Sequence, residues 1–112
     1  MKQIYDIEVY EDKKGKIPFL KWLSNIKDFK TRAKIQSRIN RIELGNFGDT
    51  KPLVGVKGIY ELREHYGQGF RIFYAKIGSR VILLLAGSTK SDQNKTIAKA
   101  KEYLDDYKRR KS

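Results

Sequence analysis

The sequence predicts an α+β domain in which helices pack on a small, mostly antiparallel sheet, with the element order β-α-α-β-β-β-α. Residues 4–10 and 59–86 contain the alternating patterns and short apolar runs that are typical of β-strands. Residues 18–45 and 92–109 instead carry apolar residues at helical spacing. The length of 112 residues suits one modest core but not two, so we expect a single domain over residues 1–112.

The first half of the chain is expected to form one strand and two helices. Residues 4–10 place Tyr5, Ile7 and Val9 on one face, which indicates a half-buried strand. Pro18 fits the first turn of a short helix over residues 19–26. A second helix is expected to begin at residue 28 or 31 and to end at Gly45. Its exposed face is basic and carries Lys30, Arg32, Lys34, Arg38 and Arg41.

The second half is expected to form three strands and a helix. The connector at residues 46–58 is rich in glycine and contains Pro52, so we expect it to be irregular. Strands follow at about residues 59–65, 70–76 and 80–86. The third is apolar throughout, as is typical of a central strand that is covered on both faces. The last helix spans about residues 92–109 and is followed by a basic tail.

The composition narrows the range of functions. The chain has 25 lysines and arginines against 13 acids, a net charge of +12, which predicts salt-sensitive binding to a polyanion such as nucleic acid or to an acidic protein. With no cysteine and one histidine, neither a disulfide nor a thiolate or histidine-rich metal centre is possible, and we expect no metal and no cofactor. The chain lacks the apolar run of a signal peptide or membrane span, which favours the cytoplasm.

The register of the hairpin places two arginines side by side. Tyr60, Leu62, Phe70, Ile72 and Tyr74 form the natural core face, so even-numbered residues pair with even-numbered ones across an odd loop. The same register puts Arg63 opposite or diagonal to Arg71 on the other face, beside Glu61 and His65. Like charges in such a position destabilise a sheet, so their presence suggests a bound anion. The alternative is that Arg63 pairs with Glu61 or Glu64 and that Arg71 faces water. Phe73 shares the arginine face and would stack on an unpaired base.

These motifs resemble the RelE/ParE superfamily of toxins, and more closely its HigB-like, phage-related "addiction module killer" branch. The resemblance rests on the strand YELR, the segment GQGFRIFY, the apolar strand and the loop GSTKSDQ that enters a helix. Residues 43–63 and 91–107 are also similar to that branch. The resemblance implies a RelE-like fold, cleavage of messenger RNA, often on the ribosome, and neutralisation by a cognate antitoxin.

The resemblance also implies a set of site residues. Arg63, Arg71 and Lys90 match the basic positions that surround the scissile phosphate. This chain departs from the pattern at two places: Glu61 replaces a lysine, and Gln93 or Asn94 stands roughly where a tyrosine is expected. The general acid and base therefore stay open between His65, Glu61, a tyrosine such as Tyr66, and solvent.

Further contacts with RNA are predicted outside this group. Lys57 would hold flanking phosphates, and the basic helix face would bind the RNA backbone or be a merely solvated surface. The residues assigned to RNA binding are Lys57, Phe73, Gln93, Lys34, Arg38 and Arg41. Two other classes fit the same chain. A ParE-like toxin would poison DNA gyrase, and a non-catalytic module would bind RNA without cutting it.

Overall fold

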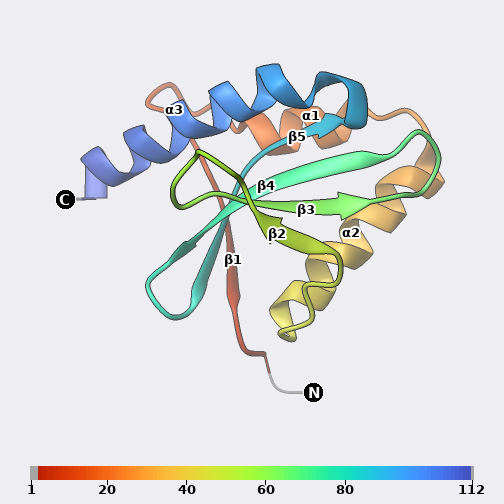
Figure 1. Ribbon diagram of the computed structural model, residues 1–112, viewed down its shortest axis with the longest axis horizontal. Coiled ribbons are helices and arrows are strands. Elements are labelled where there is room, and N and C mark those ends of the chain that lie inside the picture. Colours follow the sequence, from red (N-terminus) through yellow and green to blue (C-terminus); the bar gives the residue numbers. More distant parts are fainter. Residues whose placement is uncertain (1–2, 112) are drawn as a thin grey trace.

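The computed structural model describes residues 3–111 and contains a five-stranded sheet with the strand order β1-β5-β4-β3-β2 (Figure 1). The strands are β1 (Asp6–Val9), β2 (Thr50–Pro52), β3 (Tyr60–Glu64), β4 (Phe70–Ile77) and β5 (Val81–Thr89). β1 pairs with β5 in parallel, and the other neighbours are antiparallel. The predicted α+β class and mostly antiparallel sheet are therefore confirmed.

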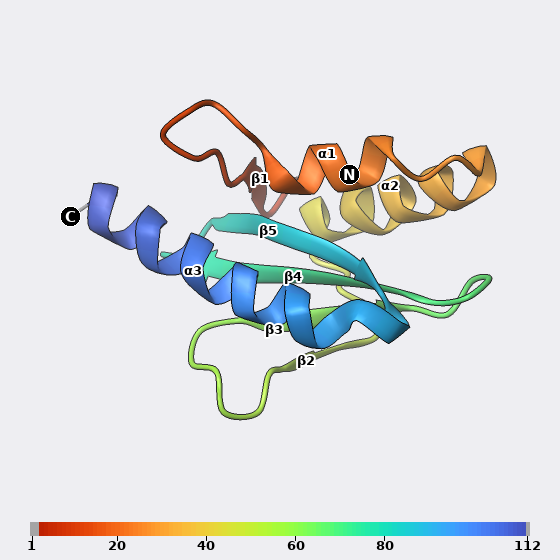
Figure 2. The ribbon, with the colours of Figure 1, turned by 90° about the horizontal axis from the view of Figure 1, so that it is seen from above.

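Three α-helices cover the sheet. They are α1 (Pro18–Ser24), α2 (Phe29–Glu43) and α3 (Gln93–Lys111), which follows a 3-10 turn at Lys90–Asp92. α1 and α2 cover one face of the sheet and α3 covers the other (Figure 2). α2 and α3 therefore lie on opposite sides of the β3–β4 hairpin (Figure 1). None of the helices in the described part of the chain is long and apolar enough to cross a membrane.

The sheet buries a separate core on each face. Even-numbered residues of β3 and β4, such as Leu62 and Ile72, form a core face, as predicted, and they pack with residues of α1 and α2. The opposite face is also buried, because α3 lays Ala100 and Leu104 against Phe73 and its neighbours on β4 and β5. β5 lies inside the sheet and its residues 82–86 are all buried, which confirms the interpretation of the apolar run as a central strand.

The hairpin has the predicted register. Leu62 lies opposite Ile72, and Arg63 lies opposite Arg71. Five residues, 65–69, join the two strands, so even-numbered residues meet even-numbered ones. Gly67 and Gly69 have φ angles of 62° and 87°, a region that glycine enters without strain, and this lets the short loop close.

Several elements differ from the prediction, and three of the differences have a clear physical reason. The connector contains the short edge strand β2, which was not predicted because Pro52 argues against a strand; Pro52 is tolerated at its end, on the edge of the sheet. β5 continues to Thr89, because its pairing with β4 persists to Phe70. The basic residues 108–111 are the last turn of α3 and not a tail, where positive charge suits the negative end of the helix dipole.

Candidate functional site

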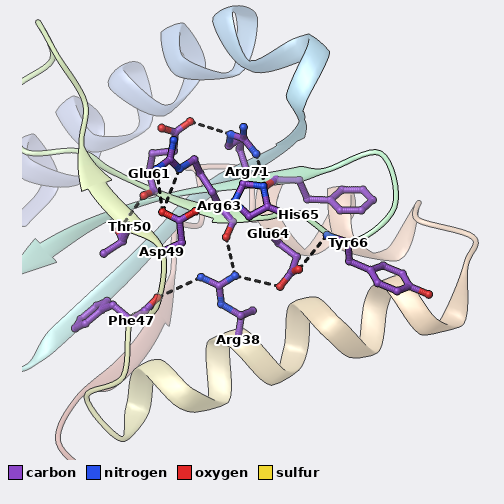
Figure 3. A network of polar contacts seen from close by, with 11 residues as sticks. Arg38, Phe47, Asp49, Thr50, Glu61, Arg63, Glu64, His65, Tyr66 and Arg71 are labelled. Atoms are coloured by element: carbon purple, nitrogen blue, oxygen red, sulfur yellow. Dashed lines mark hydrogen bonds and ion pairs between the residues drawn. The ribbon is translucent and has the colours of Figure 1, made fainter.

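The two cross-strand arginines are each paired with an acid (Figure 3). Arg63 Nη2 lies 2.9 Å from Asp49 Oδ1. Arg71 Nε lies 3.1 Å from Glu61 Oε1. The mutual repulsion of the arginines is therefore relieved by carboxylates of the same chain. Neither half of the predicted alternative holds, because Arg63 pairs with Asp49 and Arg71 does not face water.

The Arg71–Glu61 pair is buried. The two side chains are 8% and 7% exposed, on the sheet face that α3 covers. Arg71 also donates from Nη1 to the carbonyl oxygen of Phe70 at 3.1 Å. Its Nε is close to Glu61 but makes no well-aligned hydrogen bond in the described part of the chain. A buried charge needs its counterion, so each member of this pair depends on the other for a stable fold.

Asp49 joins Arg63 to His65, and no local sequence pattern marks Asp49 as a site residue. One carboxylate oxygen accepts hydrogen bonds from Arg63, and the other lies 2.7 Å from His65 Nε2. The hydrogen bond from His65 and then that from Arg63 hold the pKa of Asp49 below its usual value, so this carboxylate stays ionised. The backbone fixes its place, because Arg63 N donates to Asp49 O at 2.9 Å just before β2 begins.

His65 is open to solvent on its other side. Its side chain is 71% exposed, whereas that of Asp49 is 38% exposed. In the neutral tautomer in which Nε2 donates its proton to Asp49, Nδ1 carries a free lone pair. The arrangement therefore presents a proton acceptor to solvent, beside the guanidinium of Arg63.

Two residues predicted to bind RNA are inside the protein. Phe73 has 0% of its surface exposed, because α3 covers its face of the sheet, so no base can stack on it. Arg38 is 7% exposed and donates to Arg63 O, Glu64 Oε1 and Phe47 O. It connects α2 to β3 and to the connector, so we do not retain Arg38 or Phe73 as RNA contacts. The helical pattern placed Arg38 on the polar face of α2 but could not show which polar residues meet the sheet.

The remaining predicted residues are accessible but do not all lie together. Lys90 is exposed, and its backbone N–H donates to Gly69 O at 3.3 Å, which places it beside the hairpin. Gln93, at the start of α3, is half-buried, and its Oε1 has no hydrogen-bond partner among the described residues. Lys57 lies in the β2–β3 connection, at the end of β3 away from the hairpin turn (Figure 1). Lys34 and Arg41 are exposed on α2.

Comparisons with known proteins agree with this architecture. A family model described as phage derived protein Gp49-like (DUF891) matches residues 21–108. An uncharacterized protein of Haemophilus influenzae is 42% identical over 88 residues, which cover 79% of this chain and 87% of that protein. A structure of E. coli toxin RelE, a double-arginine mutant in the free state, aligns with a TM-score of 0.57 at 16% identity, over 89% of this chain and 95% of that one. At that identity the likeness to RelE establishes the fold. The match over residues 21–108, together with the 42% identical relative, shows that the chain belongs to the phage-derived Gp49-like family.

Proposed function

We propose that the protein is the toxin of a type II toxin–antitoxin module and an endoribonuclease that cleaves messenger RNA without a metal ion, on the ribosome. Membership in the Gp49-like family and the RelE-type fold support the toxin assignment. The observation that carries the nuclease assignment is the contact of one carboxylate, Asp49, with both Arg63 and the exposed His65. This contact supports the assignment because a guanidinium, a group that suits phosphate, and an exposed imidazole share the same carboxylate.

The proposed reaction uses the RNA's own 2′-hydroxyl as the nucleophile. His65 Nδ1 accepts the 2′-hydroxyl proton while the 2′ oxygen bonds to the adjacent phosphorus, and Asp49 stabilises the imidazolium that forms. Arg63 and Lys90 hold the phosphoryl oxygens and stabilise their developing charge. The bond from phosphorus to the 5′ oxygen then breaks, and the 5′ oxygen takes a proton from water. The hydroxide that remains takes the proton that His65 had accepted, which restores the neutral imidazole. The products are a 2′,3′-cyclic phosphate and a 5′-hydroxyl.

Arg71 and Glu61 have a different place in this proposal. Arg71 reaches the phosphate only if its buried pair with Glu61 opens, because both side chains are less than a tenth exposed. Glu61 is bound to Arg71 and covered, so it is a poorer candidate base than His65. Exposed Lys34, Arg41 and Lys57 remain proposed contacts to the RNA backbone, and a cognate antitoxin is the proposed protein partner.

The first test is a cleavage assay with purified protein, RNA and ribosomes. His65→Ala should lower the cleavage rate by about a hundredfold to ten-thousandfold, the range for loss of a general base, without changing the fold. Asp49→Asn should reduce cleavage by roughly tenfold, because the imidazolium loses its counterion, while RNA binding stays equal or tightens because Arg63 loses its competing carboxylate. Asp105→Asn, on the exposed side of α3, removes the same charge and should change neither property.

The experimental outcomes distinguish the three predicted functions: nuclease, gyrase inhibitor and non-catalytic RNA-binding module. New RNA ends that carry a cyclic phosphate and vanish in His65→Ala would support the nuclease. Full activity of a folded His65→Ala protein would refute the role given to this imidazole. Growth arrest with DNA damage and intact messages would instead indicate a gyrase inhibitor. Salt-dependent RNA binding without cleavage, with or without ribosomes, would indicate a non-catalytic module.

A further inference from the structure

Two hollows meet at Tyr66, on the α2 side of the hairpin tip. The larger has a volume of about 830 Å³ and lies between the α1–α2 corner and the hairpin, with walls that include Trp22, Ile26 and Phe70. The smaller, about 490 Å³, lies along the start of α2 and is lined in part by Phe29, Ala33 and Lys34. Tyr66 lines both, so the two hollows form one surface, which we call the Tyr66 surface.

Aromatic rings on this surface are accessible to a ligand, unlike Phe73. Phe29 is 73% exposed although it is a large apolar residue. Tyr66 is half-buried, with Lys34 Nζ 5.6 Å from its ring centroid. Trp22 is also half-buried and is held by ring contacts with Phe19 and Phe70, at centroid distances of 5.7 and 6.3 Å. Flat rings on a fixed scaffold suit a partner that has flat rings of its own.

The charge around these rings is positive. Lys27, Lys30 and Lys34 line the two hollows, and Asp28 is the one acid among the described residues that line them. The Asp28 carboxylate is already engaged, because it accepts from Thr31 Oγ1 at 2.7 Å and from Lys30 N at 3.3 Å. The neighbouring Glu64 is bound to Arg38. A partner that carries both aromatic rings and regular negative charge therefore complements this surface.

Unpaired RNA has both properties, and the surface leads to Lys90, one of the residues proposed to hold the scissile phosphate. His65 directly precedes Tyr66, and the two side chains leave the chain on opposite sides of the hairpin (Figure 3). A third hollow, lined by Gln68, Thr89, Lys90 and Ser91, shares two of its residues with the larger hollow and leads to Lys90. Amide groups at Asn25 and Gln68 could hydrogen-bond base edges.

We propose that the Tyr66 surface binds a few unpaired nucleotides of the RNA next to the cleavage site, with bases stacked on Tyr66 and Phe29 and phosphates at Lys30 and Lys34. This inference rests on the proposed function, because it assigns that RNA substrate a second contact region. Stacking on aromatic rings tolerates any base, so the surface adds affinity and positions the strand but reads little sequence.

Trp22 is the chain's one tryptophan, so its fluorescence reports directly on the larger hollow. The probe is a short, single-stranded 2′-O-methyl RNA, which lacks the nucleophilic hydroxyl and cannot be cleaved by the proposed reaction. We expect saturable quenching of Trp22 by this probe. Tyr66→Ala should weaken binding by about tenfold, within the range for loss of one stacked base, and Tyr66→Phe, which keeps the ring, should bind like the wild type.

The salt dependence of binding tests the lysines. Replacing Lys30 and Lys34 together by alanine should reduce the slope of log affinity against log salt by about 1.4, because each lost phosphate contact on a single strand is worth about 0.7. The control is the pair Lys13→Ala and Lys14→Ala, in the β1–α1 loop at the opposite end of the molecule from the hairpin tip (Figure 2). This control removes the same charge and should keep the wild-type slope.

Equal affinities of wild type and Tyr66→Ala, or equal salt slopes of the two double-lysine variants, would overturn the proposal. Absence of probe binding to the wild type would do so as well, and binding of an acidic antitoxin segment here instead would assign the surface to a protein partner. These results are separable from those of the cleavage assay. Probe binding that depends on Tyr66 in a protein that never cuts RNA would refute the nuclease and leave the RNA surface standing.

Discussion

The buried pair of Arg71 and Glu61 gives the sharpest prediction about stability. The Glu61 side chain is 7% exposed in the intact pair, and Arg71→Met would leave its carboxylate without a counterion. Removing one partner of a buried ion pair destabilises proteins by about 3–5 kcal/mol, because the remaining charge is neither solvated nor paired. The double variant Arg71→Met with Glu61→Leu removes both charges and keeps apolar volume. It should be as stable as the wild type or more stable, by up to about 4 kcal/mol.

Urea unfolding followed by Trp22 fluorescence measures this difference. For a slope of about 2 kcal/mol/M, within the range of small proteins, the loss in Arg71→Met corresponds to a fall of about 1.5–2.5 M in the unfolding midpoint. The double variant should recover that midpoint. If Arg71→Met alone unfolds within about 0.3 M of the wild type, the pair is not the buried, interdependent contact described above.

The same variants show whether Arg71 is needed for the stability of the fold or for RNA cleavage. A loss of RNA cleavage in Arg71→Met alone is ambiguous, because the variant is also expected to be destabilised. The double variant resolves this, because it should be folded. If it cleaves RNA at the wild-type rate, the pair serves the fold alone. If it is folded and inactive while His65 and Arg63 are intact, Arg71 acts on the RNA after its pair with Glu61 opens.

Three further predictions concern the rest of the fold. Arg38→Met should lower the free energy of unfolding by about 3 kcal/mol, because Glu64 Oε1 and two carbonyl oxygens lose the guanidinium that donates to them. The control is Arg41→Met, at an exposed position of the same helix. Its free energy of unfolding should stay within about 0.5 kcal/mol of the wild type in the same urea assay. Gly87→Ala should destabilise by about 1–3 kcal/mol, because a Cβ there would lie 2.2 Å from the Trp22 ring, and a near-UV circular dichroism spectrum should show that this ring has moved. Burial and the hydrogen bond to Asp106 raise the pKa of Tyr10 to about 12, so its contribution to stability is present below pH 10 and should be lost between about pH 10 and pH 12. Tyr10→Phe should reduce this alkaline loss in a series of urea midpoints, with a remainder from Tyr74, Tyr103 and Tyr107, whose pKa values burial also raises. A loss as large as that of the wild type would contradict the assignment.

Much of the sheet could be predicted because its signals are local. The alternation of Leu62 and Ile72 with polar neighbours fixes the faces of two strands, and the odd loop between them fixes the register of Arg63 opposite Arg71. The same alternation cannot distinguish solvent from a second layer. Phe73 lies on the face opposite the first core, and only the position of α3 shows that this face is buried as well. The error at Phe73 therefore came from a helix that is distant in the sequence.

The charged residues of the site were harder to predict than the sheet. Their residue types and strand positions could be predicted, but their ion-pair partners could not. Two of the pairs join segments that are distant along the chain, and no local sequence pattern shows that these segments meet. Asp49 reaches Arg63 across 14 residues, and Arg38 reaches Glu64 across 26. The short strand β2, which places Asp49, carries almost no sequence signal of its own, since three residues with a proline do not form a recognisable strand pattern.

The pairing of these charges decides which arginine is able to hold a phosphate. Three ion pairs each include at least one residue of the hairpin: Arg38–Glu64, Arg63–Asp49 and Arg71–Glu61. The three arginines therefore add no net charge, and the excess of +12 lies elsewhere. Long-range attraction of RNA therefore comes from surface lysines and arginines. A hairpin arginine can bind a phosphate only if it exchanges its carboxylate partner for that phosphate. At Arg63 the exchange is easy, because the Arg63 and Asp49 side chains are 32% and 38% exposed and water solvates the released carboxylate. At Arg71 the same exchange would leave the Glu61 carboxylate buried and without a counterion. Of the two arginines that the register brings together, Arg63 is thus the one we expect to bind the scissile phosphate without a change in the fold.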